Sequence, residues 1–420
     1  MTAAPEPLSS IERTRPPGER WRAVARATGL LAPDGSTRPT IFAEMSTLAA
    51  RTGAINLGQG FPDVDGPDVV RRSAIAAIEA GHNQYPPGPG TLELREAIAG
   101  HQRAHYGIVL DPATEILVTA GATEALAAAV LALTGPGDEV LTLEPFYDAY
   151  AAVIALAGAT HTTAPLVRTA DGFRLDGAAL RAAFTPRTRL VLLNSPHNPT
   201  GTVLTRAELE LIARLAVERD AIVLTDEVYE HLVYDDATHM PISTLPGMAE
   251  RTLTVSSAGK TFSFTGWKIG WVSGPGPLVE AVRTVKQFLT YVSGAPFQPA
   301  ITTALTDADA AAWVRELASS LAARRDLLCA GLAQAGFDVV RPQGTYFVVA
   351  DGARLGFDDG AELCRRLPGL VGIVGVPVSA FTRAGSATDA ALRSAVRFTF
   401  VKRADVLREA VDRLAGLRPA

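Results

Sequence analysis

Short apolar runs alternate with longer stretches of helical spacing through the middle of the chain. The apolar runs, which end in polar residues, lie at 114–120, 138–145, 188–196, 221–227 and 251–257. The stretches of helical spacing lie at 121–133, 147–158 and 207–220. Short buried strands interleaved with helices are typical of a mostly parallel sheet that is covered on both faces. We therefore predict an α/β fold with a mostly parallel central sheet.

The same pattern divides the chain into parts. Residues 1–40 are rich in Pro, Arg, Ser and Gly and contain one short amphipathic stretch, which predicts an N-terminal arm. Residues 68–305 carry the alternating pattern of the large domain. From 306 to 420 a long helical stretch leads into short strands and closing helices, which predicts a smaller α+β domain. We expect residues 41–67 to contribute to this small domain and to the substrate site.

Composition narrows the class of protein. The 420 residues are 47% hydrophobic and 20% charged, with a formal net charge of −5, as in an ordinary globular chain. The acidic balance argues against nucleic acid as a partner, and no apolar run is long enough to span a membrane. The two cysteines, Cys329 and Cys364, cannot form a disulfide framework, which favours a reducing compartment and a cytoplasmic location.

Lysine is scarce in this chain. Of the 39 basic residues only four are lysines, at 260, 268, 286 and 402. Because arginine is used at almost every other basic position, each of the four lysines is a candidate for chemistry that requires a primary amine. Guanidinium stays protonated and is not a nucleophile, so arginine could not replace a lysine that forms a covalent bond.

Polar and chemically useful residues follow the predicted strands. In an α/β sheet, ligands bind beyond the carboxyl ends of the strands, so these residues are expected to surround one site. The strand ends carry no phosphate-binding loop of the Walker type, no dinucleotide-binding glycine fingerprint, no G-x-S-x-G turn and no H-E-x-x-H pair. Nucleotide-binding and hydrolase functions therefore have no motif to support them.

Six motifs occur in one order along the chain. They are NLGQGFPD (56–63), NQYPPGPG (83–90), NSPHNPTG (194–201), TDEVY (225–229), SSAGKTFSFTGWKIGW (256–271) and RFTF (397–400). With these motifs the chain resembles the class I, fold-type I aminotransferases, which use pyridoxal 5′-phosphate (PLP), from residue 41 to the C-terminus. It is most similar to the branch of kynurenine, glutamine and methionine aminotransferases and to actinobacterial N-succinyldiaminopimelate aminotransferases.

The resemblance implies roles for the catalytic residues. Lys260 is expected to form the Schiff base with the cofactor and to move a proton from the substrate Cα. Asp226 is expected to pair with the pyridine nitrogen, since a carboxylate there favours the protonated ring. Tyr229 and Asn198 are expected to donate to the O3′ atom of the cofactor.

It also implies the remaining contacts. The phosphate is expected to bind at a helix start formed by Gly121, Ala122 and Thr123, where free N–H groups suit an anion. Ser257 and Lys268 match the phosphate ligands of the family, Tyr147 matches the aromatic residue that stacks on the cofactor, and Phe146 is expected to be core. Tyr85 matches a tyrosine that reaches the phosphate of a neighbouring subunit, which implies a homodimer.

On the substrate side, Arg397 is expected to bind the α-carboxylate, with Gly60 and Asn198 beside it. An arginine fork can hold a carboxylate through two hydrogen bonds, which lysine cannot do equally well. Residues 291–297 are expected to line the substrate pocket near the dimer interface. Lys286 and Lys402 match no chemistry and are expected on helix surfaces. No site in the chain is predicted to bind a metal.

The sequence thus predicts a PLP-dependent aminotransferase that moves an amino group from an L-amino acid to a 2-oxo acid. N-succinyldiaminopimelate, methionine, glutamine and kynurenine stay open as substrates. One alternative keeps the cofactor but performs β-elimination on cysteine S-conjugates or another PLP reaction at the same residues. A second is a ligand-sensing regulator, which the short N-terminal arm disfavours because it carries no helix-turn-helix pattern.

Overall fold

The computed structural model describes residues 19–170 and 172–417. Its largest element is an eight-stranded sheet in the order β2-β9-β8-β7-β6-β3-β4-β5. Neighbours from β8 to β4 are parallel, whereas β9 is antiparallel to both β8 and β2, and β5 is antiparallel to β4. The strands are β2 (Ile116–Thr119), β3 (Glu139–Glu144), β4 (Thr160–Thr169), β5 (Gly172–Leu175), β6 (Thr188–Asn194), β7 (Ile222–Asp226), β8 (Thr252–Ser257) and β9 (Gly270–Ser273).

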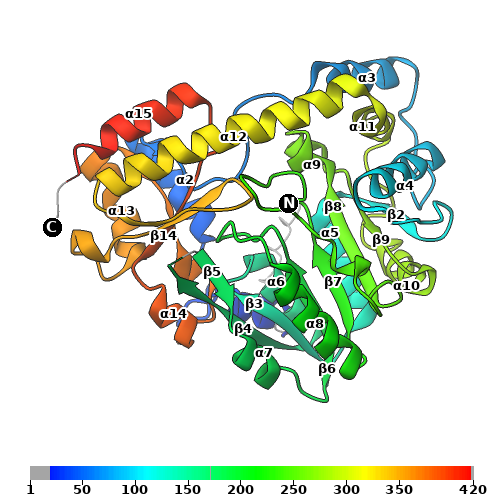
Figure 1. The fold of residues 1–420 in the computed structure, drawn as a ribbon, viewed down its shortest axis with the longest axis horizontal. Helices are drawn as coiled ribbons and strands as arrows, with labels where there is room; N and C mark the ends of the chain where they lie inside the picture. Colours follow the sequence, from blue (N-terminus) through cyan, green and yellow to red (C-terminus); the bar gives the residue numbers. More distant parts are fainter. Residues whose placement is uncertain (1–18, 171, 418–420) are drawn as a thin grey trace, which may run out of the picture.

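Successive residues of a buried strand point to opposite faces of the sheet, and the apolar runs supply both faces. In β6, Leu190 and Leu192 pack into a core with α5 (Gly121–Leu133), α6 (Asp148–Ala157) and α10 (Gly276–Lys286). Val191 and Leu193 face the other way, toward α7 (Gly177–Ala183) and α8 (Arg206–Glu218). The predicted mostly parallel, doubly covered sheet is confirmed (Figure 1).

Three more helices cover the sheet near β2 and β9. They are α3 (Asp68–Glu79), α4 (Leu92–Tyr106) and α11 (Phe297–Thr306). Their apolar faces pack on Ile116, Val118 and Trp271, which form a third core. Both termini of α4 follow local rules, since Thr91 accepts a hydrogen bond from the N–H of Leu94 and Gly107 closes the helix in the left-handed conformation at φ +71°.

A second, smaller assembly is built around a four-stranded antiparallel sheet in the order β10-β11-β14-β13. The strand β1 (Ile55–Asn56) pairs in parallel with β12 (Ile373–Val374), so the segment before the large sheet returns to the C-terminal part of the chain. Its remaining elements are α2 (Ile41–Thr52), α13 (Gly360–Val371), α14 (Ala387–Ala391), α15 (Ala404–Leu414), β10 (Asp338–Val340), β11 (Phe347–Asp351), β13 (Val376–Pro377) and β14 (Ala395–Thr399).

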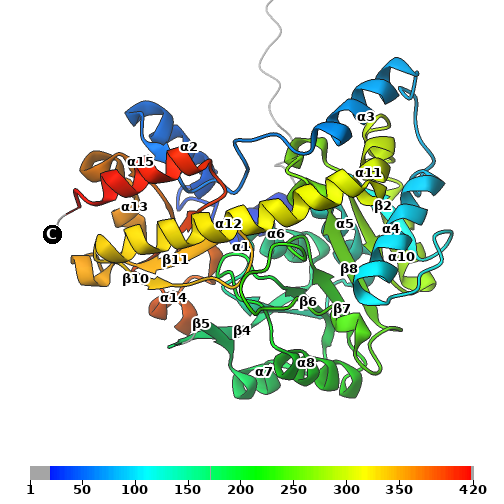
Figure 2. The ribbon, with the colours of Figure 1, turned by 45° about the horizontal axis from the view of Figure 1, so that its top comes forward.

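The helix α12 (Ala308–Gln334) links the two assemblies. It begins beside α11 and α3 on the large sheet and ends against α15 and β10, and Figure 2 shows it running across the molecule. Within the predicted N-terminal arm, α1 (Arg20–Ala27) packs against α6, while the first 18 residues of that arm lie outside the described residues. No described helix has the length and hydrophobicity needed to cross a membrane.

Candidate active site

A cavity of about 400 Å³ lies beyond the carboxyl ends of the parallel strands. The last residues of β6, β7 and β8 line it, together with residues that follow β2 and β3 in the chain, as the strand-end rule predicts. Twelve of the thirteen site residues predicted from the sequence line this cavity: Gly60, Gly121, Ala122, Thr123, Tyr147, Asn198, Asp226, Tyr229, Ser257, Lys260, Lys268 and Arg397. Residues that lie up to 337 positions apart in the chain therefore share one site.

Asp226 is the last residue of β7 and its carboxyl group is buried. Its Oδ2 atom accepts a hydrogen bond of 2.7 Å from the phenol of Tyr150, and its Oδ1 atom accepts one of 3.4 Å from the N–H of Val228. Burial raises the pKa of Asp226 to about 6, and the Tyr150 hydrogen bond opposes that rise. The carboxyl group is therefore ionised at neutral pH but close to its titration range.

A chain of hydrogen bonds joins the end of β7 to the small sheet. The side chain of Asn194 donates to the carbonyl of Asp226 at 2.8 Å and accepts from the N–H of Asn198 at 2.7 Å. Asn198 in turn accepts from Nη1 of Arg397 at 2.8 Å, and Nη2 of Arg397 donates to the carbonyl of Gly58 at 3.0 Å. Among the residues that the structure describes, the buried Nε of Arg397 finds no hydrogen-bond partner.

Aromatic rings enclose the Arg397 guanidinium. Its carbon lies 3.9 Å from the ring centre of Phe347, 4.6 Å from that of Phe381 and 5.5 Å from that of Phe42. Burial lowers the pKa of Arg397 to about 10, so the group stays a cation at neutral pH. A buried guanidinium with one free N–H, held at the cavity wall, is a binding group for a carboxylate.

Lys260 reaches the cavity from the short helix α9 (Ala258–Thr261), which starts where β8 ends. The Ser257 hydroxyl caps α9 by accepting from the N–H of Gly259 at 3.2 Å. The Lys260 Nζ atom lies 5.9 Å from the ring centre of Tyr229 and 5.8 Å from that of Tyr346. The amine is thus placed among aromatic groups in the cavity that also holds the Asp226 carboxylate, and this enclosed position suits an amine that forms a covalent bond.

The start of α5 forms a tight backbone turn at the cavity floor. Gly121 adopts φ +77°, and a Cβ on it would lie 3.2 Å from Nζ of Lys268. A Cβ on Gly270 would come within 2.7 Å of the Gly121 carbonyl carbon and 2.8 Å of the Ala122 nitrogen. The helix start, the Lys268 amine and the Ser257 hydroxyl line the same cavity, as an anion site requires.

The family described as aminotransferase class I and II matches residues 52–414 of the chain. The chain belongs to this aminotransferase family. It is 57% identical over 387 residues to the Mycobacterium tuberculosis protein named "Probable N-succinyldiaminopimelate aminotransferase DapC", covering 91% of this chain and 97% of that one. It is 37% identical over 378 residues to the methionine aminotransferase of Escherichia coli, covering 90% and 96% of the two chains.

A solved structure of a relative has the same fold as this chain. The N-succinyldiaminopimelate aminotransferase of Mycobacterium tuberculosis superposes with a TM-score of 0.87 at 56% identity and covers 90% of this chain and 97% of that chain. The predicted fold-type I architecture and the predicted transaminase activity are confirmed by these relatives.

Tyr85 of the aminotransferase does not line the cavity. Its side chain is 80% exposed and packs edge-to-face on Tyr291, with 5.3 Å between the ring centres. Residues 291–297 do not line the cavity either, so their predicted place in the pocket does not hold within this chain. The cross-subunit role of Tyr85 stays a prediction.

The sequence-based placement of two lysines is wrong. Lys286 is buried at the end of α10, where its Nζ donates to the carbonyls of Gly88 at 3.1 Å and Tyr291 at 2.6 Å. Lys402 is also buried and donates to the carbonyl of Phe61 at 2.9 Å. Each amine binds the carbonyl of one residue far away in the chain, Gly88 for Lys286 and Phe61 for Lys402, and a helical pattern carries no sign of such contacts. Phe146, in contrast, is buried as predicted.

Sequence reasoning missed several residues of the cavity wall. Asp148 and Tyr150 lie one and three residues after the predicted Tyr147, and Gln59 directly precedes the predicted Gly60, so the available signal is proximity to a strand end or motif. The aromatic residues Phe42 and Phe347 carry no such signal, because isolated aromatic residues are usually core.

Proposed function

We propose that this aminotransferase uses PLP and that its amino donor is an N-succinyldiaminopimelate-type amino acid, with a 2-oxo acid as acceptor. The observation that carries the PLP assignment is the joint placement of Lys260, Asp226 and Arg397 around one cavity. The 57% identity to the mycobacterial relative supports the substrate class. Methionine- and kynurenine-type substrates have support from relatives of lower identity.

The residues of the cavity fit the cofactor. Because Gly121 has no side chain, its turn leaves space for the phosphate group of the cofactor. Lys268 and Ser257 add a cation and a hydroxyl that can bind this phosphate. Asp226 supplies the carboxylate for a protonated ring nitrogen, and Tyr229 and Asn198 supply donors for the ring oxygen. Tyr147 lines the cavity with an aromatic face. When bound there, PLP supplies an aldehyde and an electron-withdrawing ring.

The chain's own groups then perform three tasks. Arg397 binds the substrate α-carboxylate and so fixes the orientation of Cα. Lys260 would hold the cofactor through its amine, and that amine is the base that would take the proton from the substrate Cα and return it on the other side of the transferred nitrogen. Asp226 and its Tyr150 hydrogen bond keep a negative charge at the cavity floor, which stabilises a cation on the ring.

A donor-by-acceptor activity panel tests the substrate. N-succinyldiaminopimelate, methionine, glutamine and kynurenine are each offered with several 2-oxo acids, and kcat/KM is compared. The proposal requires N-succinyldiaminopimelate to exceed the others at least tenfold. Release of pyruvate and ammonia from a cysteine S-conjugate without any oxo-acid acceptor, at a higher rate than transamination, would contradict it and favour the β-elimination alternative.

A Lys260→Arg variant tests the cofactor assignment. It keeps the positive charge but removes the primary amine, so both turnover and the visible absorption band of lysine-bound PLP are expected to disappear. The exposed Lys268→Arg variant serves as the comparison, since a phosphate can be bound by either side chain, and it is expected to keep the band. A Lys260→Arg protein with wild-type turnover would overturn the assignment.

The proposal includes a homodimer in which Tyr85 reaches the phosphate of the other subunit. Its support is the exposed pair of Tyr85 and Tyr291, together with the 86% exposure of Phe288 nearby in the chain. Two free cysteines, of which Cys364 is buried, support a cytoplasmic enzyme. Sedimentation measurements test the dimer, and a Tyr85→Phe variant is expected to bind PLP more weakly without loss of the dimer.

A further inference from the structure

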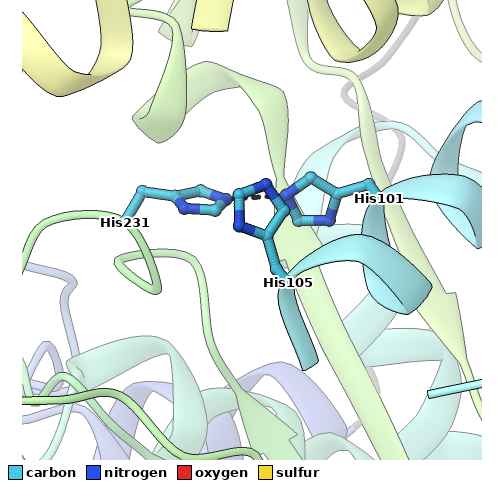
Figure 3. A group of neighbouring side chains, drawn as sticks. All are labelled: His101, His105 and His231. Carbon is cyan, nitrogen blue, oxygen red and sulfur yellow. Dashed lines mark hydrogen bonds between the residues drawn. The ribbon is translucent and has the colours of Figure 1, made fainter. Parts of the chain in front are cut away.

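Three histidines outside the active-site cavity lie close together, and they form what we call the histidine cluster (His101, His105 and His231). His101 and His105 are one helical turn apart on α4, while His231 follows β7 in the chain (Figure 3). One ring nitrogen of each residue lies within 4.8 Å of the others, and the Nε2 atoms of His101 and His231 are 2.7 Å apart. The ring centres are 4.5–4.9 Å apart.

The proposed transaminase reaction does not use this cluster. None of its three residues lines the cavity, although His231 is only two residues from Tyr229. The segment after β7 therefore presents Asp226 and Tyr229 to the cavity and His231 to α4. The three imidazoles thus converge from two distant segments at a place that the proposed reaction does not use.

The surroundings of the cluster suit a cation. Glu230 is buried, its Oε1 atom accepts from the Ser256 hydroxyl at 2.5 Å, and its Oε2 atom has no hydrogen-bond partner among the described residues. Glu230 also acts electrostatically on both His101 and His231. A buried carboxylate beside imidazole ligands is a frequent partner of protein-bound metals, because it compensates part of their charge.

The cluster reaches solvent at one of its three residues. His105 is exposed, which leaves an open side for a water ligand. Three histidines with one open position match the coordination that zinc accepts in proteins.

We propose that His101, His105 and His231 together bind one Zn²⁺ ion, with water as the fourth ligand. Zinc–nitrogen bonds of about 2.0–2.1 Å place tetrahedral ligand nitrogens roughly 3.3 Å apart, so the 2.7 Å pair must separate by roughly 0.6 Å. The proton that this pair shares moves to an Nδ1 atom. For His101 the buried Gln102 amide, whose nitrogen lies 3.5 Å from Nδ1, turns to present its oxygen as acceptor.

The bound ion would join α4 to the segment that carries Asp226 and Tyr229. The cluster thereby connects the outer helix layer with the backbone that positions two active-site groups. We expect the ion to raise thermal stability, because a ligand that binds only the folded state stabilises it.

Zinc binding to the untagged holoenzyme tests this proposal. The protein is dialysed against a chelator and titrated with Zn²⁺ in competition with a chromophoric chelator. One equivalent per chain is expected, and the dissociation constant should rise at least 100-fold in His105→Ala, since a three-ligand site loses one ligand. His105 is exposed, so its removal leaves the core intact.

His82→Ala is the matched control, because His82 is exposed and lies outside the cluster. It should bind zinc like the wild type. Zinc should raise the midpoint of thermal unfolding of the wild type and His82→Ala but not that of His105→Ala. Co²⁺ should give the intense visible bands of a tetrahedral site only in the wild type and His82→Ala. Equal zinc binding by His105→Ala and the wild type, or less than about a tenth of an equivalent in the wild type, would overturn the proposal.

Discussion

The phenol oxygen of Tyr150 donates a hydrogen bond of 2.7 Å to the Oδ2 atom of Asp226. Tyr150 lies on α6 and Asp226 ends β7, so the contact joins two elements of the large sheet assembly at the cavity floor. The bond favours the ionised carboxyl group, whose pKa burial has raised to about 6. Tyr150 is therefore a positioning residue that keeps Asp226 charged.

A Tyr150→Phe variant is expected to bind PLP more weakly at low pH. Loss of the bond raises the pKa of Asp226 further, by roughly one unit, because a hydrogen bond to a charged group contributes about 1.5 kcal/mol. A carboxyl group is ionised only above its pKa, so the PLP dissociation constant should rise steeply below about pH 7 in the variant and below about pH 6 in the wild type.

Spectroscopic titration of the cofactor-free protein between pH 5 and 9 measures this shift. Tyr234→Phe is the control, since Tyr234 is also buried but donates to the carbonyl of Thr345, away from the cavity. It should lose stability without moving the pH profile. An unchanged profile in Tyr150→Phe would show that this phenol does not tune Asp226.

An Arg397→Lys variant should lower kcat/KM for amino donors by roughly 30- to 100-fold, which corresponds to about 2–3 kcal/mol. Lysine cannot bind the substrate carboxylate while also holding Asn198 and Gly58, which Arg397 does through its two Nη atoms. Steady-state kinetics measure the loss. Arg393→Lys, at an exposed position where Arg393 pairs with Asp359 at 2.8 Å, should remain within twofold of the wild type.

A Gly270→Ala variant should weaken PLP binding at least tenfold. Its Cβ would meet the backbone of Gly121 and Ala122 at 2.7–2.8 Å, and overpacking of this kind costs about 1–3 kcal/mol. The strand β9 and the start of α5 must then separate, which moves the phosphate donors. Gly266→Ala is the matched control, because a Cβ there meets no atom within 4 Å. Equal dissociation constants for the two variants would refute the phosphate site at Gly121.

A Lys286→Met variant should unfold several degrees below the wild type. The substitution removes the donor from the carbonyls of Gly88 and Tyr291, and the loss of each of these part-buried hydrogen bonds costs about 0.5–1.5 kcal/mol. Both carbonyls belong to the loops that carry the Tyr85–Tyr291 pair, so the proposed dimer should also dissociate more readily. Arg283→Met on the same helix removes only an exposed ion pair with Glu280 and should change the unfolding midpoint by less than about one degree. A Lys286→Met midpoint equal to that of Arg283→Met would contradict this account.

The sheet could be predicted because its strands are buried on both faces. Strands such as β3 and β6 consist of near-continuous apolar runs; β6 ends at Asn194, which lines the cavity, and β3 is followed by Tyr147, which lines it as well. The strand β9 is not predicted from the sequence, because it has only four residues and lies within the motif that contains Lys260. It follows a turn at Lys268, whose φ is +55°.

The missed features depend on contacts between distant parts of the chain. His101 and His105 show helical spacing that sequence can reveal, but their partner His231 lies 130 residues from His101. The burial of Lys286 depends on Gly88, which is 198 residues away. Local patterns carry no information about such pairs, and so the resemblance identified the active site whereas the histidine cluster required the folded chain.

The reversed direction of β9 fixes how the two active-site lysines are spaced. Ser257 at the end of β8 pairs with Gly270 at the start of β9, so the twelve residues between them leave and re-enter the sheet at the same edge. Lys260 and Lys268 both lie within this closed connection. The length of this connection helps to set the distance between the two amines, so an inserted residue is expected to separate Lys260 from Lys268 and to weaken the proposed binding of PLP. Exposed surface loops generally tolerate added residues, but we expect this connection not to tolerate them, because both of its lysines are proposed to bind the same cofactor molecule.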